Sequence, residues 1–229
     1  MLKESLENVS TRPVVPFDPG IDSLLLLDFT ERNELLTEDI VNSTGRFSQY
    51  VDEQRIKAGA RYGIGGYDEH RTVYSRSKVF DASTTDEEPR RLHLGIDIWS
   101  DEGTPVCSPV DGVIHSFAFN DQYGDYGATI ILRHRIDEFV FHSLYGHLSL
   151  KDLEGLQEGK PVKAGEEIAH FGEPKENGHW PPHLHFQLVI DMEGMKGDYP
   201  GVCKYSEREK YLANCPDPDL LLRMMQFAR

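Results

Sequence analysis

The chain of 229 residues is poor in cysteine. Its three cysteines, Cys107, Cys203 and Cys215, are odd in number, and none stands in a Cys-x-x-Cys motif. Such a set is not typical of a disulfide framework or of a cysteine-rich zinc site. Pairing of Cys203 with Cys215 in an oxidising compartment stays open. Cys107 is expected to pack in the core as a small apolar side chain.

Long apolar runs are also missing. The first twenty residues hold nothing that could form the apolar part of a signal peptide. The longest early apolar stretch, residues 24–27, is far too short to cross a bilayer. These features predict no transmembrane segment and a cytoplasmic location. The alternative is an envelope location, reached if the chain is exported by another route or is a processed form.

Clusters of basic residues are absent as well. Lys and Arg together number 24 against 39 Asp and Glu, so the formal net charge is −15. Phosphate backbones and anionic membrane surfaces attract basic patches, so nucleic acid and anionic lipid are excluded as expected partners. A hydrophobic content of 38% and a charged content of 28% are typical of a folded globular protein.

The order of secondary-structure signals divides the chain into three parts. Residues 1–85 are predicted to form an N-terminal arm and a helical extension. Residues 86–195 hold short alternating and β-branched stretches between turns, which is typical of an antiparallel β domain. Residues 196–229 are predicted to be a loop and a short helix packed on it. The expected strands lie at 93–99, 105–120, 127–135, 139–149, 166–172 and 183–191. The fold class is therefore mainly β, an antiparallel sheet or sandwich.

Local signals add detail at both ends. Residues 1–20 lack periodicity and predict a loose arm, whereas residues 21–60 look helical. Residues 62–81 are turn-rich and then strand-like. In the closing helix, Asp217 is the expected cap and Pro218 the expected first helical residue.

Residues 181–189, PPHLHFQLV, put two histidines one residue apart in a predicted strand. Because a strand alternates its faces, His183 and His185 point the same way, about 6–7 Å apart along the chain. On a packed apolar face each neutral imidazole would need a partner. The pair indicates either a shared metal or catalytic site or an exposed strand face.

Two further motifs carry histidine. HLGID contains His93 and Asp97, which would be about 13 Å apart in an extended strand. Gly95 between them permits a sharp bend that would bring both to one ion. YGHLS contains His147 after a glycine. Each motif alone also fits an ordinary strand end, but two nitrogen donors, a carboxylate and a water make a reasonable catalytic zinc shell.

The three motifs, in this order, resemble the lysostaphin/LytM family of zinc metalloendopeptidases. The segments GTPVCSPVDGVIHSF and VKAGEEIAHFG are also similar to family segments, and the likeness covers roughly residues 90 to 190. The resemblance implies a LytM-like metallopeptidase domain with the duplicated hybrid motif fold. It also implies a peptidase that cuts stem peptides or cross-links in peptidoglycan, or muropeptides.

The resemblance further implies a role for each motif residue. His93, Asp97 and His185 would bind Zn²⁺, and His147 and His183 would be the catalytic pair that does not bind the metal. The ion would lower the pKa of a bound water toward about 7, and that water would attack a peptide carbonyl. The imidazoles would stabilise the oxyanion and transfer protons.

The stretch before the last motif departs from the family. Many members carry a small Thr-Gly or Ser-Thr-Gly segment there, whereas this chain reads PKENGHWPPHLHF. His179 and Trp180 are expected to add bulk beside the cleft, which argues against a preference for glycine bridges. Coverage of the groove by the N-terminal helices, as a latency element, is a further hypothesis.

Other functions stay open. The same fold could serve as a non-catalytic binding or activator module, or the chain could be a cytoplasmic peptide hydrolase. Parts of the β domain also resemble phosphocarrier and biotinyl domains, although a carrier would not need Asp97. His70 could approach the cleft if residues 62–81 fold over the domain. The remaining histidines are expected to be exposed or hydrogen-bonded: His115, His134, His142 and His170.

Overall fold

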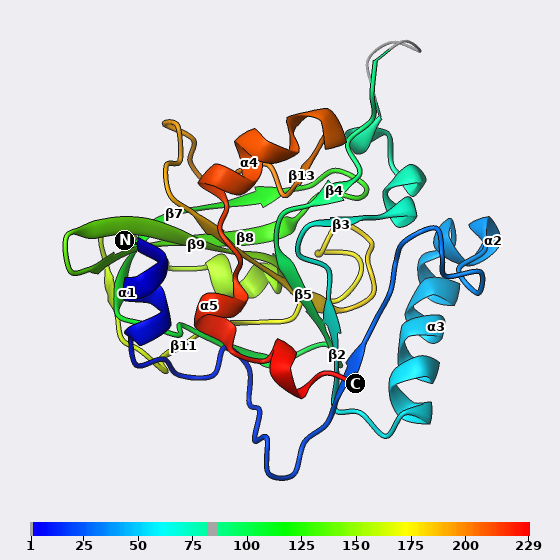
Figure 1. Ribbon diagram of the computed structural model, residues 1–229, viewed down its shortest axis with the longest axis horizontal. Coiled ribbons are helices and arrows are strands. Elements are labelled where there is room, and N and C mark those ends of the chain that lie inside the picture. Colours follow the sequence, from blue (N-terminus) through cyan, green and yellow to red (C-terminus); the bar gives the residue numbers. More distant parts are fainter. Residues whose placement is uncertain (1, 82–86) are drawn as a thin grey trace.

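The computed structural model describes residues 2–81 and 87–229, and within them the strands form three sheets (Figure 1). The largest has the strand order β1-β2-β5-β12-β9-β8-β7-β10; the others are β13-β4-β3 and β11-β6. All of these pairs are antiparallel except β1 with β2. The predicted fold class, mainly β and antiparallel with helical additions, is confirmed.

The strands are β1 (Leu24–Leu26), β2 (Tyr62–Gly65), β3 (Glu69–His70), β4 (Leu92–His93), β5 (Ile96–Trp99), β6 (Pro105–Cys107), β7 (Gly112–Asn120), β8 (Gly127–Ile136), β9 (Phe139–Leu148), β10 (Pro161–Val162), β11 (Glu167–His170), β12 (His183–Val189) and β13 (Val202–Cys203). The α-helices are α1 (Leu2–Asn8), α2 (Glu38–Val41), α3 (Thr44–Lys57), α4 (Arg208–Asn214) and α5 (Asp219–Leu222). Short 3-10 helices are η1 (Thr72–Arg76), η2 (Lys78–Phe80), η3 (Leu150–Leu153), η4 (Tyr205–Glu207) and η5 (Met225–Phe227).

Strand β12 is buried along its whole length, so both faces of the sheet are covered at this point. Because side chains alternate along a strand, Leu184, Phe186 and Leu188 point into the main apolar core. The opposite face of the same strand carries His183, His185 and Gln187. A polar row buried this deeply needs hydrogen-bond partners or an ion.

The N-terminal part differs from the prediction in three places. Residues 1–20 are not a loose arm, because they contain α1 and bury Leu6, Val14 and Val15 in the core. Residues 21–60 are helical only in their second half. Their leucine run forms β1, parallel to β2, since a short apolar run does not distinguish strand from helix.

In residues 62–81 strand and non-strand structure come in the opposite order to the one predicted. The strand β2 comes first, and the later residues form η1 and η2. The predicted domain boundary between residues 85 and 86 lies outside the described residues, and the division of the chain into three parts stays a prediction.

The closing helix is shorter than predicted. α5 ends at Leu222 because Arg223 adopts the left-handed conformation, with φ of 52°. Pro218 is the N-cap residue and not the first helical residue, while the Asp217 carboxylate accepts the N–H of Asp219 at 2.9 Å. Helix α4 was not predicted. The Arg223 guanidinium donates to carbonyls at the end of α1, including that of Val9 at 2.7 Å, and so joins the two ends of the chain.

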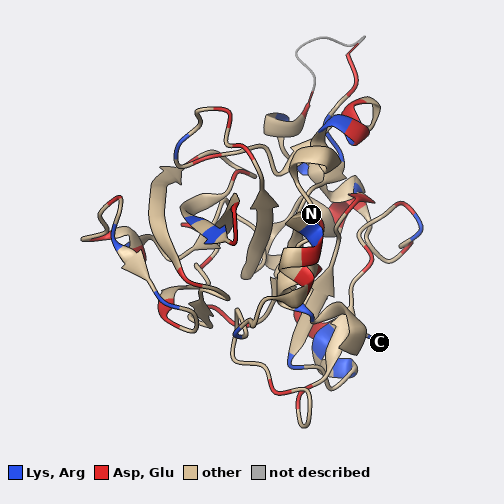
Figure 2. Ribbon diagram, turned by 60° about the vertical axis from the view of Figure 1, so that its left-hand side comes forward, with Lys and Arg blue, Asp and Glu red and all other residues tan. Residues whose placement is uncertain are grey.

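The cysteines are all described and all free. Cys203 and Cys215 are buried without a disulfide between them, and Cys107 is only half-buried, in β6. In Figure 2 the strands are mainly uncharged, and most acidic and basic residues lie in loops and helices. Among the described helices, none is both long and apolar enough to span a bilayer.

Candidate active site

The order of strands in the large sheet brings the three histidine motifs together. β12 lies between β5 and β9, so His185 is paired with Asp97 on one side and with Gly146, the neighbour of His147, on the other. His93 ends β4, and the chain turns at Leu94 and Gly95 before it enters β5. The predicted bend between His93 and Asp97 is confirmed.

Gly95 is required for a reason that the sequence did not reveal. Its backbone is not left-handed. A Cβ atom at this position would lie 2.6 Å from Cε1 of His185. The glycine therefore makes room for the imidazole of the neighbouring strand.

Three ligand atoms converge at the centre of this site. His93 Nε2 lies 2.8 Å from His185 Nδ1, and Asp97 Oδ1 lies 3.3 Å from the first and 3.1 Å from the second. Ligands around a tetrahedral ion with bonds of about 2.0–2.1 Å are roughly 3.3–3.4 Å apart. The three atoms could hold a metal ion of this size with a small outward movement.

The outer hydrogen bonds of the two imidazoles fix their tautomers. His93 Nδ1 lies 2.8 Å from the carbonyl of Gly66, and His185 Nε2 lies 2.9 Å from Oε1 of Gln187. Gln187 is oriented by its own amide nitrogen, which donates to the carbonyl of Pro200 at 3.1 Å. Both outer nitrogens therefore carry the hydrogen, and both inner nitrogens present lone pairs to each other and to a carboxylate. This donor set fits a cation.

Burial and charge keep the centre in the metal-binding protonation state. Burial, helped by the Arg71 guanidinium, lowers the pKa of His93 to about 3. Burial alone would raise the pKa of Asp97, but the Arg71 guanidinium beside it outweighs burial and holds this pKa well below its usual range. The structure thus has a neutral imidazole and an ionised carboxylate at neutral pH.

A second pair of histidines stands beside the first group. The rings of His147 and His183 are 4.1 Å apart between centroids. His147 Nδ1 lies 2.8 Å from the carbonyl of Asn177, and His183 Nδ1 lies 2.7 Å from that of Pro181. Each therefore donates from Nδ1 and keeps an acceptor at Nε2, and His183 Nε2 is 4.0 Å from Asp97 Oδ1.

Backbone strain helps to aim His147. Its φ is 62°, which is rare for a residue with a side chain, and the register between β8 and β9 shifts near this end of the strand. Burial and the neighbouring His183 and His185 hold the pKa of His147 well below its usual value. Burial likewise lowers the pKa of His183 to about 4.

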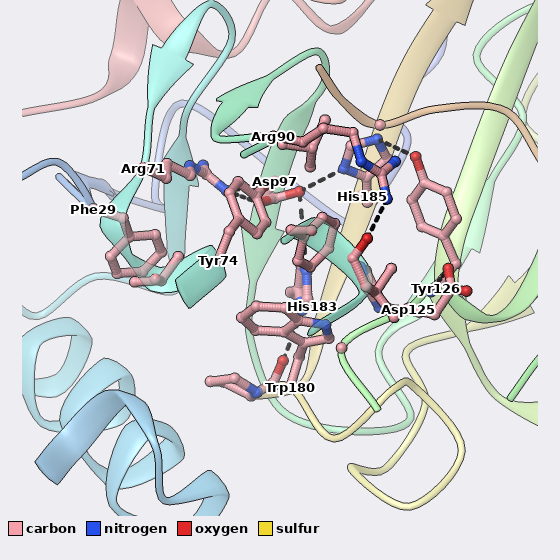
Figure 3. Close-up of a pocket in the computed structure, with 18 of the residues that line it drawn as sticks. Phe29, Arg71, Tyr74, Arg90, Asp97, Asp125, Tyr126, Trp180, His183 and His185 are labelled. Carbon is pink, nitrogen blue, oxygen red and sulfur yellow. Dashed lines mark hydrogen bonds and ion pairs between the residues drawn. The ribbon is translucent and has the colours of Figure 1, made fainter. Parts of the chain in front are cut away.

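A partly open cavity of about 150 Å³ is lined by four of the five motif residues, Asp97, His147, His183 and His185. None of the five motif residues is more than 6% exposed. Aromatic side chains supply much of the wall, and they come from the first eighty residues as well as from later parts of the chain: Phe29, Phe47, Tyr74, Trp99 and Trp180. Phe29, Tyr74 and Trp180 are labelled in Figure 3. Trp180 adds bulk beside the site, as expected, whereas His179 stacks on Tyr123.

Other histidines lie outside this cavity. His70 is exposed and packs edge-on against Tyr205, so its hypothesised approach to the cleft is wrong. The hydrogen-bonded roles expected for His115, His134 and His170 are confirmed. His142 is buried, and its Nδ1 has no hydrogen-bond partner.

Three residues at the site were missed by sequence reasoning. Gln187 follows His185 by two residues, and strand alternation could have placed it on the same face. Tyr126 lies with its hydroxyl 3.4 Å from His185 Nε2. Arg71, beside the suspected His70, forms an ion pair with Asp97. The sequence around Tyr126 and Arg71 carries no motif that would have singled them out.

Comparison with known proteins agrees with this geometry. Residues 91–196 match the model of Peptidase family M23, so the chain carries a domain of the LytM/lysostaphin family. A protein of Haemophilus influenzae named Uncharacterized metalloprotease is 31% identical over 139 residues, which are 58% of this chain and 27% of that protein. The DD-carboxypeptidase/endopeptidase Mpg of Neisseria meningitidis serogroup B is 37% identical over 103 residues, 44% of this chain and 21% of that one.

Among solved structures, a zinc containing peptidase from Vibrio cholerae is 29% identical, over 44% of this chain and 28% of that one. Its TM-score of 0.36 is too low to add to the fold assignment. The chain spans about a quarter of the length of the curated relatives that it matches.

Proposed function

We propose that this protein is a zinc-dependent endopeptidase that hydrolyses peptide bonds, with peptidoglycan stem peptides or cross-links as its substrate. The observation that carries the proposal is the pair of inward lone pairs on His93 and His185 beside Asp97 Oδ1. His93, Asp97 and His185 are the proposed ligands, and His147 and His183 the proposed catalytic residues. A bound zinc ion would supply Lewis acidity, which activates a water molecule and polarises the scissile carbonyl.

The two catalytic histidines are arranged to accept protons. Because their pKa values are lowered by burial, both are neutral at pH 7. Each donates from Nδ1 to a carbonyl, so its Nε2 can take a proton from the attacking water. Only after that transfer can Nε2–H donate to the oxyanion or to the leaving amine. Either histidine can serve as the base and then as the acid.

The proposed substrate rests on relatives and not on the site alone. Mpg is named a DD-carboxypeptidase/endopeptidase, and another relative, from Bacillus subtilis, is named L-Ala–D-Glu endopeptidase. Both names describe bonds found in peptidoglycan stem peptides. Peptidoglycan lies outside the cytoplasmic membrane, so this substrate requires an envelope location.

The test is digestion of purified peptidoglycan by the full chain, followed by mass spectrometry of the released muropeptides. We expect defined fragments from the zinc-loaded protein, none after chelation, recovery on adding zinc back, and a release slowed by about 10²–10⁴-fold from His183→Ala. Release that persists in chelator would contradict the metal-dependent mechanism. A zinc-loaded protein that releases nothing would contradict the substrate, and short peptides would then test the alternative of a cytoplasmic hydrolase.

The burial of the site residues favours a second candidate, a binding module with the same fold. All five residues are buried, and a peptide would have to enter between the aromatic walls. Retention of all the proposed ligands and both histidines argues against loss of catalysis. A protein that takes up no zinc when it is supplied would favour this candidate.

A further inference from the structure

Arg71 is a buried charge in the segment that precedes the family-matched region. It follows β3, its side chain is 2% exposed, and it lies 20 residues before the match begins at residue 91. A buried guanidinium must be paired. Its Nε donates to Glu69 at 2.6 Å, one terminal nitrogen donates to the carbonyl of Gly65 at 3.2 Å, and the other forms an ion pair with Asp97.

The two carboxylate oxygens of Asp97 face different partners. Its Oδ1 faces His93 and His185, at 3.3 and 3.1 Å, whereas its Oδ2 is the atom bonded to Arg71. Figure 3 shows Asp97 between Arg71 and His185. One oxygen is therefore available to an ion at the centre, and the other is occupied by a cation that the protein itself provides.

We propose that Arg71 is a positioning residue that holds Asp97 as a one-oxygen ligand of the metal. The inference rests on the proposed metal site. A free carboxylate can bind an ion through one or both oxygens, and a second oxygen would take the position that the reacting water needs. By holding Oδ2, Arg71 keeps that position open.

The backbone is shaped to admit the arginine. A Cβ atom at Gly66 would lie 1.7 Å from a terminal nitrogen of Arg71, and Gly66 has φ of 107°. The carbonyl of this same glycine accepts the outer N–H of His93. Gly66, in the connection from β2 to β3, thus contacts one proposed ligand and makes room for the arginine that contacts another, although both residues lie outside the region that matches the peptidase family.

Packing restricts the arginine to this position. Its guanidinium carbon lies 5.3 Å from the ring centre of Phe29 and 5.6 Å from that of Trp99, within the range of cation–π contacts. The Tyr74 hydroxyl is 3.4 Å from the nitrogen that pairs with Asp97. A lysine could keep the charge but not the planar fork that reaches Asp97, Glu69 and Gly65 together.

The test replaces zinc by Co²⁺, whose visible absorption reports the number of ligands without any activity assay. We expect the intense four-coordinate spectrum in the wild type and a several-fold weaker, five-coordinate one in Arg71→Gln, because Asp97 then binds through both oxygens. Arg71→Lys should lie between them. Arg90→Gln is the matched control: it also lines the cavity but has no contact with the proposed ligands, and its spectrum should equal that of the wild type.

The outcomes separate the two proposals. An Arg71→Gln protein that binds cobalt with the wild-type spectrum would overturn the role of Arg71 and leave the metal site intact. A wild-type protein that binds no cobalt would overturn both. If Arg71→Gln does not fold, a zinc-loaded crystal structure of the wild type decides the question. Both Asp97 oxygens at about 2.0–2.2 Å from the ion would overturn the inference, and only Oδ1 at that distance would support it.

Discussion

Two buried polar clusters in this protein, each containing histidine, differ in how their hydrogen bonds are completed. In β8 and β9, His134 Nδ1 donates to the carbonyl of Asp111 at 2.9 Å, and its Nε2 lies 2.6 Å from the Ser143 hydroxyl. That hydroxyl is also 3.0 Å from the hydroxyl of Tyr145. Hydroxyl groups both donate and accept, so this cluster is complete without an ion.

The cluster of His93, Asp97 and His185 lacks such a donor at its centre. The atoms at its centre are two imidazole nitrogens with lone pairs and one carboxylate oxygen. The other nitrogen of each imidazole donates a hydrogen bond to a carbonyl group. Burial lowers the pKa of a histidine in both clusters, to about 4 for His134 and about 3 for His93. Neither burial nor a shifted pKa therefore distinguishes a metal site from a structural one; the unpaired inward acceptors do.

The largest effects are expected from two substitutions that distinguish the residues that bind the metal from those that transfer protons. His185→Ala should lose both the metal and hydrolysis, since it removes one of three ligands. His183→Ala should keep the metal, with hydrolysis reduced by about 10²–10⁴-fold, the usual contribution of a general acid or base. Metal analysis and muropeptide release on the same preparations measure both.

His134→Gln is the control for this comparison, because it changes the complete cluster. It should keep metal and activity near wild-type levels. Loss of metal from His183→Ala, or retention of it by His185→Ala, would contradict the assignment of roles.

A smaller effect is expected on the free energy of unfolding when the pH is lowered. A neutral, buried His134 with a pKa of about 4 binds fewer protons in the folded state than in the unfolded state, where its pKa is near 6.5. Its contribution to stability is complete above about pH 6.5 and is lost as the pH falls toward about 4. Between pH 7 and pH 5 the wild type should lose about 2 kcal/mol more unfolding free energy than His134→Gln.

Denaturant unfolding of the metal-free proteins at the two pH values measures this difference. The other buried histidines contribute equally to both proteins, so only the difference between them reports on His134. Equal losses in the two proteins would show that His134 does not titrate in this range.

Much of the site could be predicted from the sequence, because its motifs are local. Strand alternation puts His183 and His185 on one face, and the spacing of His93 and Asp97 around Gly95 predicted their bend. Arg71 and Tyr126 could not be found in this way. They reach the site through contacts between segments that no periodic pattern joins, and Arg71 lies 26 residues from its partner Asp97.

The fold shows the same limit. The long strands β7, β8 and β9 were predicted from alternation and β-branched residues. α1 and β1 were missed because their structure depends on tertiary packing: Leu6 is buried in the core, and Leu24 lies beside β2. Short apolar segments carry too little periodicity to reveal such packing.

Anomalous X-ray scattering at the zinc edge, from crystals of the full chain grown with zinc, tests the central claim most directly. The account predicts one strong peak at about 2.0–2.2 Å from His93 Nε2, Asp97 Oδ1 and His185 Nδ1. It predicts no peak at the cluster of His134 and Ser143. A zinc-saturated crystal with no peak among the first three atoms would contradict the account.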